Sequence, residues 1–160
     1  MDSVRGRQFK AFPRALQSAL RSYAQSGGNL FVSGAYLGTD LRDSVDIAFA
    51  KEVLHYRLST GFASRTGQVL PTRGAVFSDS LALTFATEPT ETGYGVEAPD
   101  GIAPAGGGVP ALRYGDSMTG AGLAWKGSSG VVVLGFPFET VVGETRRTAL
   151  MHEILGFFRR

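Results

Sequence analysis

The chain has 160 residues, of which 43% are hydrophobic and 19% are charged, so we expect one domain that is large enough to bury a core. Its formal net charge is only +2 and its basic residues are scattered, so the sequence shows no basic stripe of the kind that nucleic-acid binding needs. No apolar run approaches the roughly 20 residues of a membrane span. Cysteine is absent and only two histidines occur, which excludes disulfides, thiolate chemistry and a multi-histidine metal centre.

The first expected elements are a helix and a strand joined by two glycines. Helical spacing of apolar residues predicts a helix over residues 8–25. Pro13 falls within its first turns, so the alternative is that the regular helix begins near Pro13. The glycines at 27–28 end this helix, and residues 29–33, with an apolar centre at 30–32, follow as a strand. A helix that leads directly into a strand is typical of a parallel sheet. We therefore expect Ser33 at a carboxyl strand end, where open α/β sheets hold their ligands.

A second helix and a run of short strands follow. Asp43 or Ser44 is placed to cap a helix that runs to about Tyr56. From residue 59 to residue 110 the pattern changes to short β-like pieces separated by turn residues. These pieces are residues 67–70, 75–77, 81–85 and 94–97. Residues 98–110 are rich in glycine and proline and are the longest predicted loop.

A hairpin and a helix close the chain. Residues 121–125 and 130–136 flank a glycine-containing turn and predict a β-hairpin. The apolar run 131–134 does not alternate with polar residues, which is typical of a central strand covered on both faces. The last helix starts at Glu144 or Thr145. Because few strands suit a parallel sheet and the chain opens on a helix, we expect the C-terminal portion of a larger α/β unit.

Two segments resemble class I glutamine amidotransferase-like domains. The first is the helix end and strand Tyr23-x-x-x-Gly-Gly-Asn-Leu-Phe-Val-Ser-Gly, and the second is residues 132–139 with the following helix 147–158. Residues 94–102 and 113–116 are similar to the version carried by exported Bacteroidetes proteins, which are often labelled xanthan lyase or N-acetylmuramoyl-L-alanine amidase.

The resemblance implies a flavodoxin-like three-layer fold with flanking helices and a β-hairpin, in a single domain over residues 1–160. It implies an exported protein in the periplasm, at the cell surface or outside the cell, although no apolar segment typical of a secretory signal follows the N-terminal charges. The implied partners are other domains of the parent polypeptide and polysaccharide or peptidoglycan. We expect no nucleic-acid partner, no membrane insertion and no cofactor.

Amidotransferase chemistry does not carry over with the resemblance. The family's glutaminase needs a cysteine at a strand-to-helix turn and a His-x-Glu pair downstream, and this sequence has neither. We therefore expect a noncatalytic or degenerate amidotransferase-like accessory domain. The alternatives are a glycan- or amide-bond-directed hydrolase and a carbohydrate-binding module. The module would need exposed aromatic residues on one face, and its candidates are Trp125, Tyr94 and Tyr114.

Four residues are candidates for a shared crevice: Ser33, Tyr36, Asp40 and Glu139. If the early and late strands are parallel neighbours, all four follow strand ends at the same sheet edge. A hydrolase would use Ser33 as a nucleophile, or Asp40 and Glu139 as an acid-base pair. Ser33 lacks the first glycine of a Gly-x-Ser-x-Gly turn. His55 is a candidate general base, although a histidine at a helix end also suits the helix dipole.

The carboxylates Asp40, Asp43 and Asp46 form a cluster after the first strand. Their oxygens are the ligand type that calcium prefers. Helix capping and the helix dipole explain Asp43 and Asp46 without an ion, so we expect no metal site.

Overall fold

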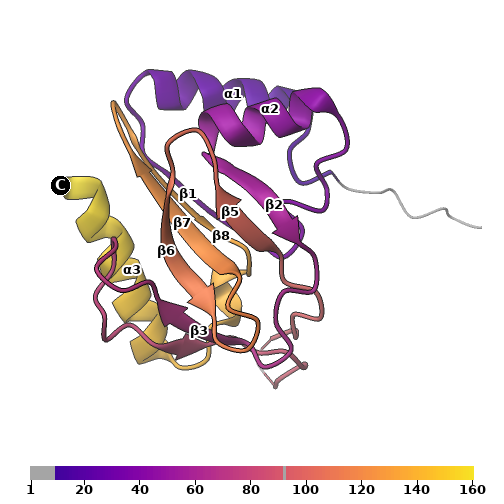
Figure 1. The fold of residues 1–160 in the computed structure, drawn as a ribbon, viewed down its shortest axis with the longest axis vertical. Helices are drawn as coiled ribbons and strands as arrows, with labels where there is room; N and C mark the ends of the chain where they lie inside the picture. Colours follow the sequence, from indigo (N-terminus) through magenta and orange to yellow (C-terminus); the bar gives the residue numbers. More distant parts are fainter. Residues whose placement is uncertain (1–9, 92) are drawn as a thin grey trace, which may run out of the picture.

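The computed structural model describes residues 10–91 and 93–160, and Figure 1 shows their mixed α/β fold. In chain order its elements are α1 (Arg14–Gln25), β1 (Leu30–Ser33), α2 (Ser44–Val53), β2 (Tyr56–Thr60), β3 (Gln68–Pro71), β4 (Leu83–Thr84), β5 (Gly101–Pro104), β6 (Val109–Tyr114), β7 (Gly120–Lys126), β8 (Gly130–Leu134), the 3-10 helix η1 (Phe138–Thr140) and α3 (Glu144–Arg159). The larger sheet has six strands in the order β1-β8-β7-β6-β3-β4, and a second sheet pairs β2 with β5.

The early and late apolar segments are parallel neighbours in the larger sheet, as predicted. Leu30 of β1 lies opposite Val131 of β8, and Ser33 lies opposite Leu134. Both strands therefore end at the same sheet edge. The β7–β8 hairpin is also confirmed, and it is antiparallel, as are all strand pairs of this sheet except β1–β8.

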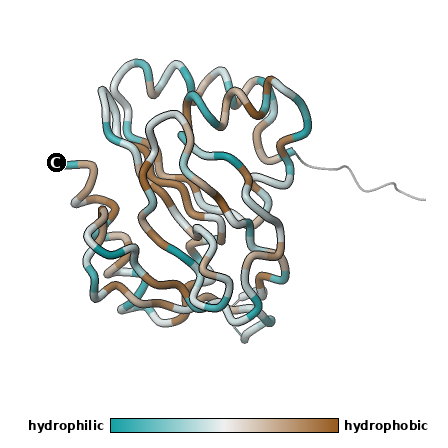
Figure 2. Tube along the Cα trace, viewed as in Figure 1, coloured by the Kyte–Doolittle hydropathy of each residue, from teal (hydrophilic) through white to brown (hydrophobic). Residues whose placement is uncertain are grey.

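The strand β8 divides the core into two parts, and all five of its residues are buried. Val131 and Val133 join a cluster formed with α1 and α2, while Val132 and Leu134 join a cluster formed with α3. Figure 1 shows α1 and α2 side by side and away from α3, and Figure 2 shows hydrophobic residues along the central strands. Burial on both faces explains why this run is apolar without alternation. Each such side chain contributes about 1.5–3 kcal/mol to folding.

The helix ends follow local sequence signals. The predicted start of the first helix at Gln8 lies outside the described residues, and α1 begins at Arg14, directly after Pro13. Asp43 caps α2, because its side chain accepts hydrogen bonds from the N–H groups of Val45 and Asp46. The helix ends at Val53, earlier than predicted, since His55 has a positive φ of 60° and β2 starts at the next residue.

The middle of the chain differs most from the predictions. The pieces at 67–70 and 81–85 contain β3 and β4, whereas 75–77 and 94–97 form no strand. Residues 98–110, predicted as one long loop, contain β5 and the start of β6. Residues 105–108 form the turn between these strands, with positive φ at Gly106 and Gly107. The glycines and prolines around this turn therefore lie within strands or at their ends.

Candidate functional site

A cavity of about 620 Å³ lies at the carboxyl ends of β1 and β8. All four residues predicted to share a crevice line it: Ser33, Tyr36, Asp40 and Glu139. Lys10, Arg42 and Tyr94 also line it. We call this cavity the crevice. Its position agrees with the general rule that ligands of α/β sheets bind outside the carboxyl ends of parallel strands.

Ser33 connects β1 to the segment that follows β8. Its Oγ accepts a hydrogen bond of 3.2 Å from the N–H of Phe138, and the N–H of Gly34 donates to the carbonyl of Leu134. No histidine is among the described residues that line the crevice. The serine hydroxyl thus supports loop backbone, and no imidazole stands beside it to take its proton.

Asp40 fixes the segment that leads into α1. It accepts a hydrogen bond from the N–H of Ala11, and it accepts another from Nε of Arg42 at 3.2 Å. Its side chain is only 11% exposed. The carboxylate therefore joins two segments of the crevice wall that are distant in sequence.

Glu139 pairs with a tyrosine at the boundary of the crevice. The hydroxyl of Tyr94 donates to Oε1 of Glu139 at 2.7 Å. Burial and this hydrogen bond together raise the pKa of Tyr94 to about 12. Both residues also line a neighbouring cavity of about 390 Å³ that reaches Gly143 and Arg147. The Tyr94–Glu139 pair therefore stands between two cavities.

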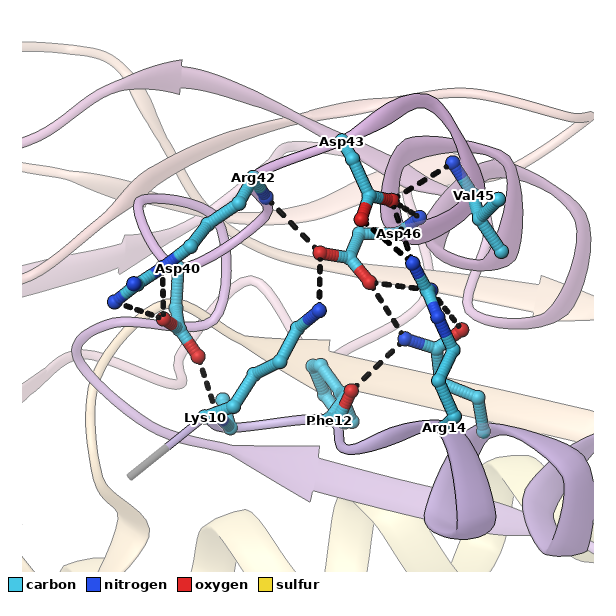
Figure 3. A network of polar contacts seen from close by, with 10 residues as sticks. Lys10, Phe12, Arg14, Asp40, Arg42, Asp43, Val45 and Asp46 are labelled. Atoms are coloured by element: carbon cyan, nitrogen blue, oxygen red, sulfur yellow. Dashed lines mark hydrogen bonds and ion pairs between the residues drawn. The ribbon is translucent and has the colours of Figure 1, made fainter. Parts of the chain in front are cut away.

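A polar network holds one wall of the crevice, and Figure 3 shows it. Its centre is the fully buried Asp46, which receives Nζ of Lys10, Nη1 of Arg14 and Nε2 of Gln17, each at 2.7 Å. The N–H of Arg42 donates to the same carboxylate at 3.0 Å. Burial by itself raises the pKa of Asp46, but the hydrogen bonds outweigh it and hold the pKa well below its usual range. The ionised carboxylate thereby ties α1 to α2 and to the loop of residues 34–43 that joins β1 to α2, which we call the crevice loop.

The carboxylates of Asp40, Asp43 and Asp46, for which we expected no metal, have protein partners. Asp43 caps α2. Its Oδ1 and Oδ2 also accept hydrogen bonds from Nη2 of Arg14, at 2.8 and 2.6 Å. Within residues 10–91 and 93–160, no three or more of His, Cys, Asp and Glu are grouped to hold a metal ion.

Asp100 is the residue that sequence reasoning missed. It is fully buried, and its Oδ2 accepts hydrogen bonds from the N–H groups of Gly38 at 2.6 Å and Thr39 at 3.1 Å. Its Oδ1 has no hydrogen-bond partner among the described residues. Burial raises the pKa of Asp100, against the effect of these hydrogen bonds. Pro-Asp-Gly is an ordinary turn signal, so nothing in the local sequence distinguishes this carboxyl group from a surface one.

His55 lies apart from the crevice. Its ring stacks on that of Trp125 with 3.9 Å between ring centres, and Nδ1 lies 2.8 Å from the carbonyl of Gly106. The residue is 7% exposed, and burial lowers its pKa. It lines a separate small cavity, and Ser33 is not among the residues that line that cavity. The structure thus does not place this histidine as a base for the candidate serine.

The three aromatic candidates for glycan contact do not share a surface. Tyr114 is fully buried, and its hydroxyl donates to the carbonyl of Asp100. Trp125 is half-buried against His55. Tyr94 is exposed, and the second exposed tyrosine of the crevice is Tyr36.

No protein-family model, curated protein or solved structure matches this chain. The described residues include no helix with the length and apolar character of a membrane span. The chemistry of the crevice is therefore the basis on which a function can be argued.

Proposed function

We propose that this chain is a noncatalytic, degenerate amidotransferase-like accessory domain that binds a glycan segment weakly in the crevice. Its parent would be an exported protein associated with polysaccharide or peptidoglycan, whose other domains are its partners. The proposal includes a flavodoxin-like three-layer arrangement. The parallel pair β1–β8, with α1 and α2 in one core cluster and α3 in the other, supports it. The family and the export rest on the sequence resemblance.

The observation that carries the noncatalytic function is the bonding of the crevice's polar groups. Ser33 accepts from backbone, Asp40 accepts from Ala11 and Arg42, and Glu139 accepts from Tyr94. A catalytic serine needs a base within hydrogen-bond reach, and among the described residues the hydrogen-bond partner of Ser33 Oγ is the backbone N–H of Phe138. These groups hold the walls of the crevice in place, which is a structural role that suits a binding cavity.

Two exposed tyrosines support a glycan as the ligand. Tyr36 is 58% exposed and Tyr94 is 54% exposed, so each offers ring surface beside carboxylates that accept hydrogen bonds. Tyrosine has an apolar ring and a polar tip, which suits a sugar with apolar faces and hydroxyl edges. The neighbouring cavity of about 390 Å³ beyond Tyr94 leaves room for a further part of an extended chain.

An activity assay separates this function from the hydrolase alternative. The purified protein would be incubated with peptidoglycan fragments, neutral and acidic polysaccharides and glutamine, and released reducing ends, amines and ammonia would be measured. We expect no product above the background of the Ser33→Ala and Asp40→Asn/Glu139→Gln variants. Turnover that either variant abolishes would establish the hydrolase instead.

A binding assay tests the crevice itself. Titration with fragments of the same glycans, followed by amide NMR shifts, should locate the affected residues at the ends of β1 and β8. Tyr36→Ala and Tyr94→Ala should each weaken binding. Tyr23→Ala is the matched control, because Tyr23 is 52% exposed and does not line the crevice. Equal binding by all three variants would contradict the proposed site.

A further inference from the structure

A second cavity, of about 480 Å³, lies between α2, the crevice loop and the β2–β5 sheet. Gly38 and Leu41 line it, whereas Leu37, Thr39 and Asp40 line the crevice. The two cavities share no lining residue. The same loop thus separates two distinct cavities, and the second one is outside the proposed glycan function.

The walls of the second cavity are largely apolar. They include Leu41, Ile47, Tyr56, Leu58 and Pro104. The hydroxyl of Tyr56 is occupied, because it donates to the carbonyl of Leu37 at 2.6 Å. The volume lies within the range of about 300–1,000 Å³ that is usual for small-molecule sites.

The charged residues of the lining are Lys51 on α2 and Arg57 on β2, and both are exposed. No ion pair joins either of them to a carboxylate among the described residues. Glu52, the neighbour of Lys51, pairs with Arg21 instead. The cavity therefore combines apolar walls with two cations and no acidic side chain in its described lining.

We propose that this cavity binds a small amphipathic carboxylate, such as a medium-chain fatty acid. The hydrocarbon tail occupies the apolar walls, and the carboxylate accepts charge-assisted hydrogen bonds from Lys51 and Arg57. A carboxylate matches the planar donor pair of an arginine, and hydrogen bonds to ionised groups are stronger than neutral ones. An uncharged tail of equal length would bury the same apolar surface without these bonds.

The test compares octanoate with octanol, both below the concentrations at which they aggregate. Calorimetry should give octanoate a dissociation constant at least about tenfold lower than that of octanol, as one charge-assisted hydrogen bond predicts. Amide NMR shifts should appear on α2 and β2. The same affinity for both compounds would overturn the proposal, and so would the absence of octanoate binding.

Variants identify the cations. The double variant Lys51→Gln/Arg57→Gln should weaken octanoate binding about tenfold or more and leave octanol binding unchanged. Ile47→Asp places a carboxylate at a half-exposed wall position and should abolish octanoate binding without affecting the core. Arg73→Gln, an exposed arginine outside the cavity, is the matched control. Unchanged octanoate affinity in the double variant would refute the site.

Discussion

Asp46 and Asp100 are both fully buried carboxyl groups that accept hydrogen bonds from the crevice loop, yet their pKa values shift in opposite directions. Asp46 has four hydrogen-bond donors, of which Lys10 and Arg14 are cationic. Asp100 has two backbone donors on one oxygen and no described partner on the other. Burial pushes both pKa values up, but the pKa of Asp46 is lowered and that of Asp100 is raised.

The difference shows that burial does not by itself determine the charge of an acid. The number and charge of its donors decide whether the ionised form is retained. Asp46 is an anionic centre that holds two helices together. Asp100 positions the backbone of Gly38 and Thr39 and favours its neutral form more than an exposed aspartate does.

The largest effect is expected from Asp46→Ala, because it leaves the donors of Lys10, Arg14 and Gln17 without their acceptor. Removal of one partner of a buried charge network costs about 3–5 kcal/mol. Since Lys10 and Arg14 remain partly exposed, we expect about 3 kcal/mol in the free energy of unfolding. Urea denaturation followed by circular dichroism measures it. The exposed Asp79→Ala is the control, and equal losses in both variants would contradict the role of Asp46.

A smaller effect is expected at Asp100. Asp100→Ala removes the acceptor of two backbone N–H groups and should cost about 2 kcal/mol. Asp100→Asn keeps one oxygen acceptor and removes the ionisable group, so it should cost about 1 kcal/mol or less. Amide NMR shifts should change at Gly38 and Thr39 in the alanine variant. If both variants lower the free energy of unfolding equally, the side-chain oxygen that accepts from Gly38 and Thr39 is not the source of the stabilisation.

The pH dependence of stability should separate the two acids. The folded pKa of Asp46 lies below its unfolded value of about 3.9, so its contribution is present above that pH and is lost as the pH falls. The folded pKa of Asp100 is raised, so its contribution is present below about pH 3.9 and is lost as the pH rises through the folded value.

Unfolding free energies between about pH 3 and pH 8 check this sign. Asp46→Asn should flatten the decline on the acid side, and Asp100→Asn should flatten the decline above about pH 4. The same pH profile for both variants would contradict the opposite pKa shifts of Asp46 and Asp100.

The smallest effect is expected at the surface pair of Arg21 and Glu52, which are 2.9 Å apart with side chains 40% and 56% exposed. Arg21→Gln should change the free energy of unfolding by about 0.5 kcal/mol or less, since solvent screens exposed ion pairs. A loss comparable with that of Asp46→Ala would mean that exposure is not what distinguishes the two ion pairs.

The sequence predicted the parts of the fold that local patterns determine. Asp43 as a cap, the β7–β8 hairpin and the buried run at 131–134 follow from capping, turn and burial signals a few residues long. The strand β5 could not be found in this way. Its partner is β2, some forty residues earlier in the chain, and its glycine and proline content is typical of a loop.

The candidate site shows the same limit. Ser33 and Glu139 could be placed at one sheet edge because both follow strands whose neighbour relation the apolar pattern indicated. Tyr94 lines the crevice and Asp100 holds the backbone of Gly38 and Thr39, and both come from the middle of the chain, where only tertiary packing sets their position. A buried acid inside a Pro-Asp-Gly sequence, which is typical of a surface turn, has no signal in local sequence.

The stacking of His55 on Trp125 gives the protein an internal optical reporter. Trp125 is the single tryptophan of the chain, and an imidazolium in ring contact quenches indole fluorescence far more strongly than neutral imidazole does. Because the pKa of His55 is lowered by burial, emission should stay bright until the solution is more acidic than a free histidine would require. Tryptophan fluorescence thus reports the protonation of the His55 ring, which lies between α2 and β2 and packs on β7.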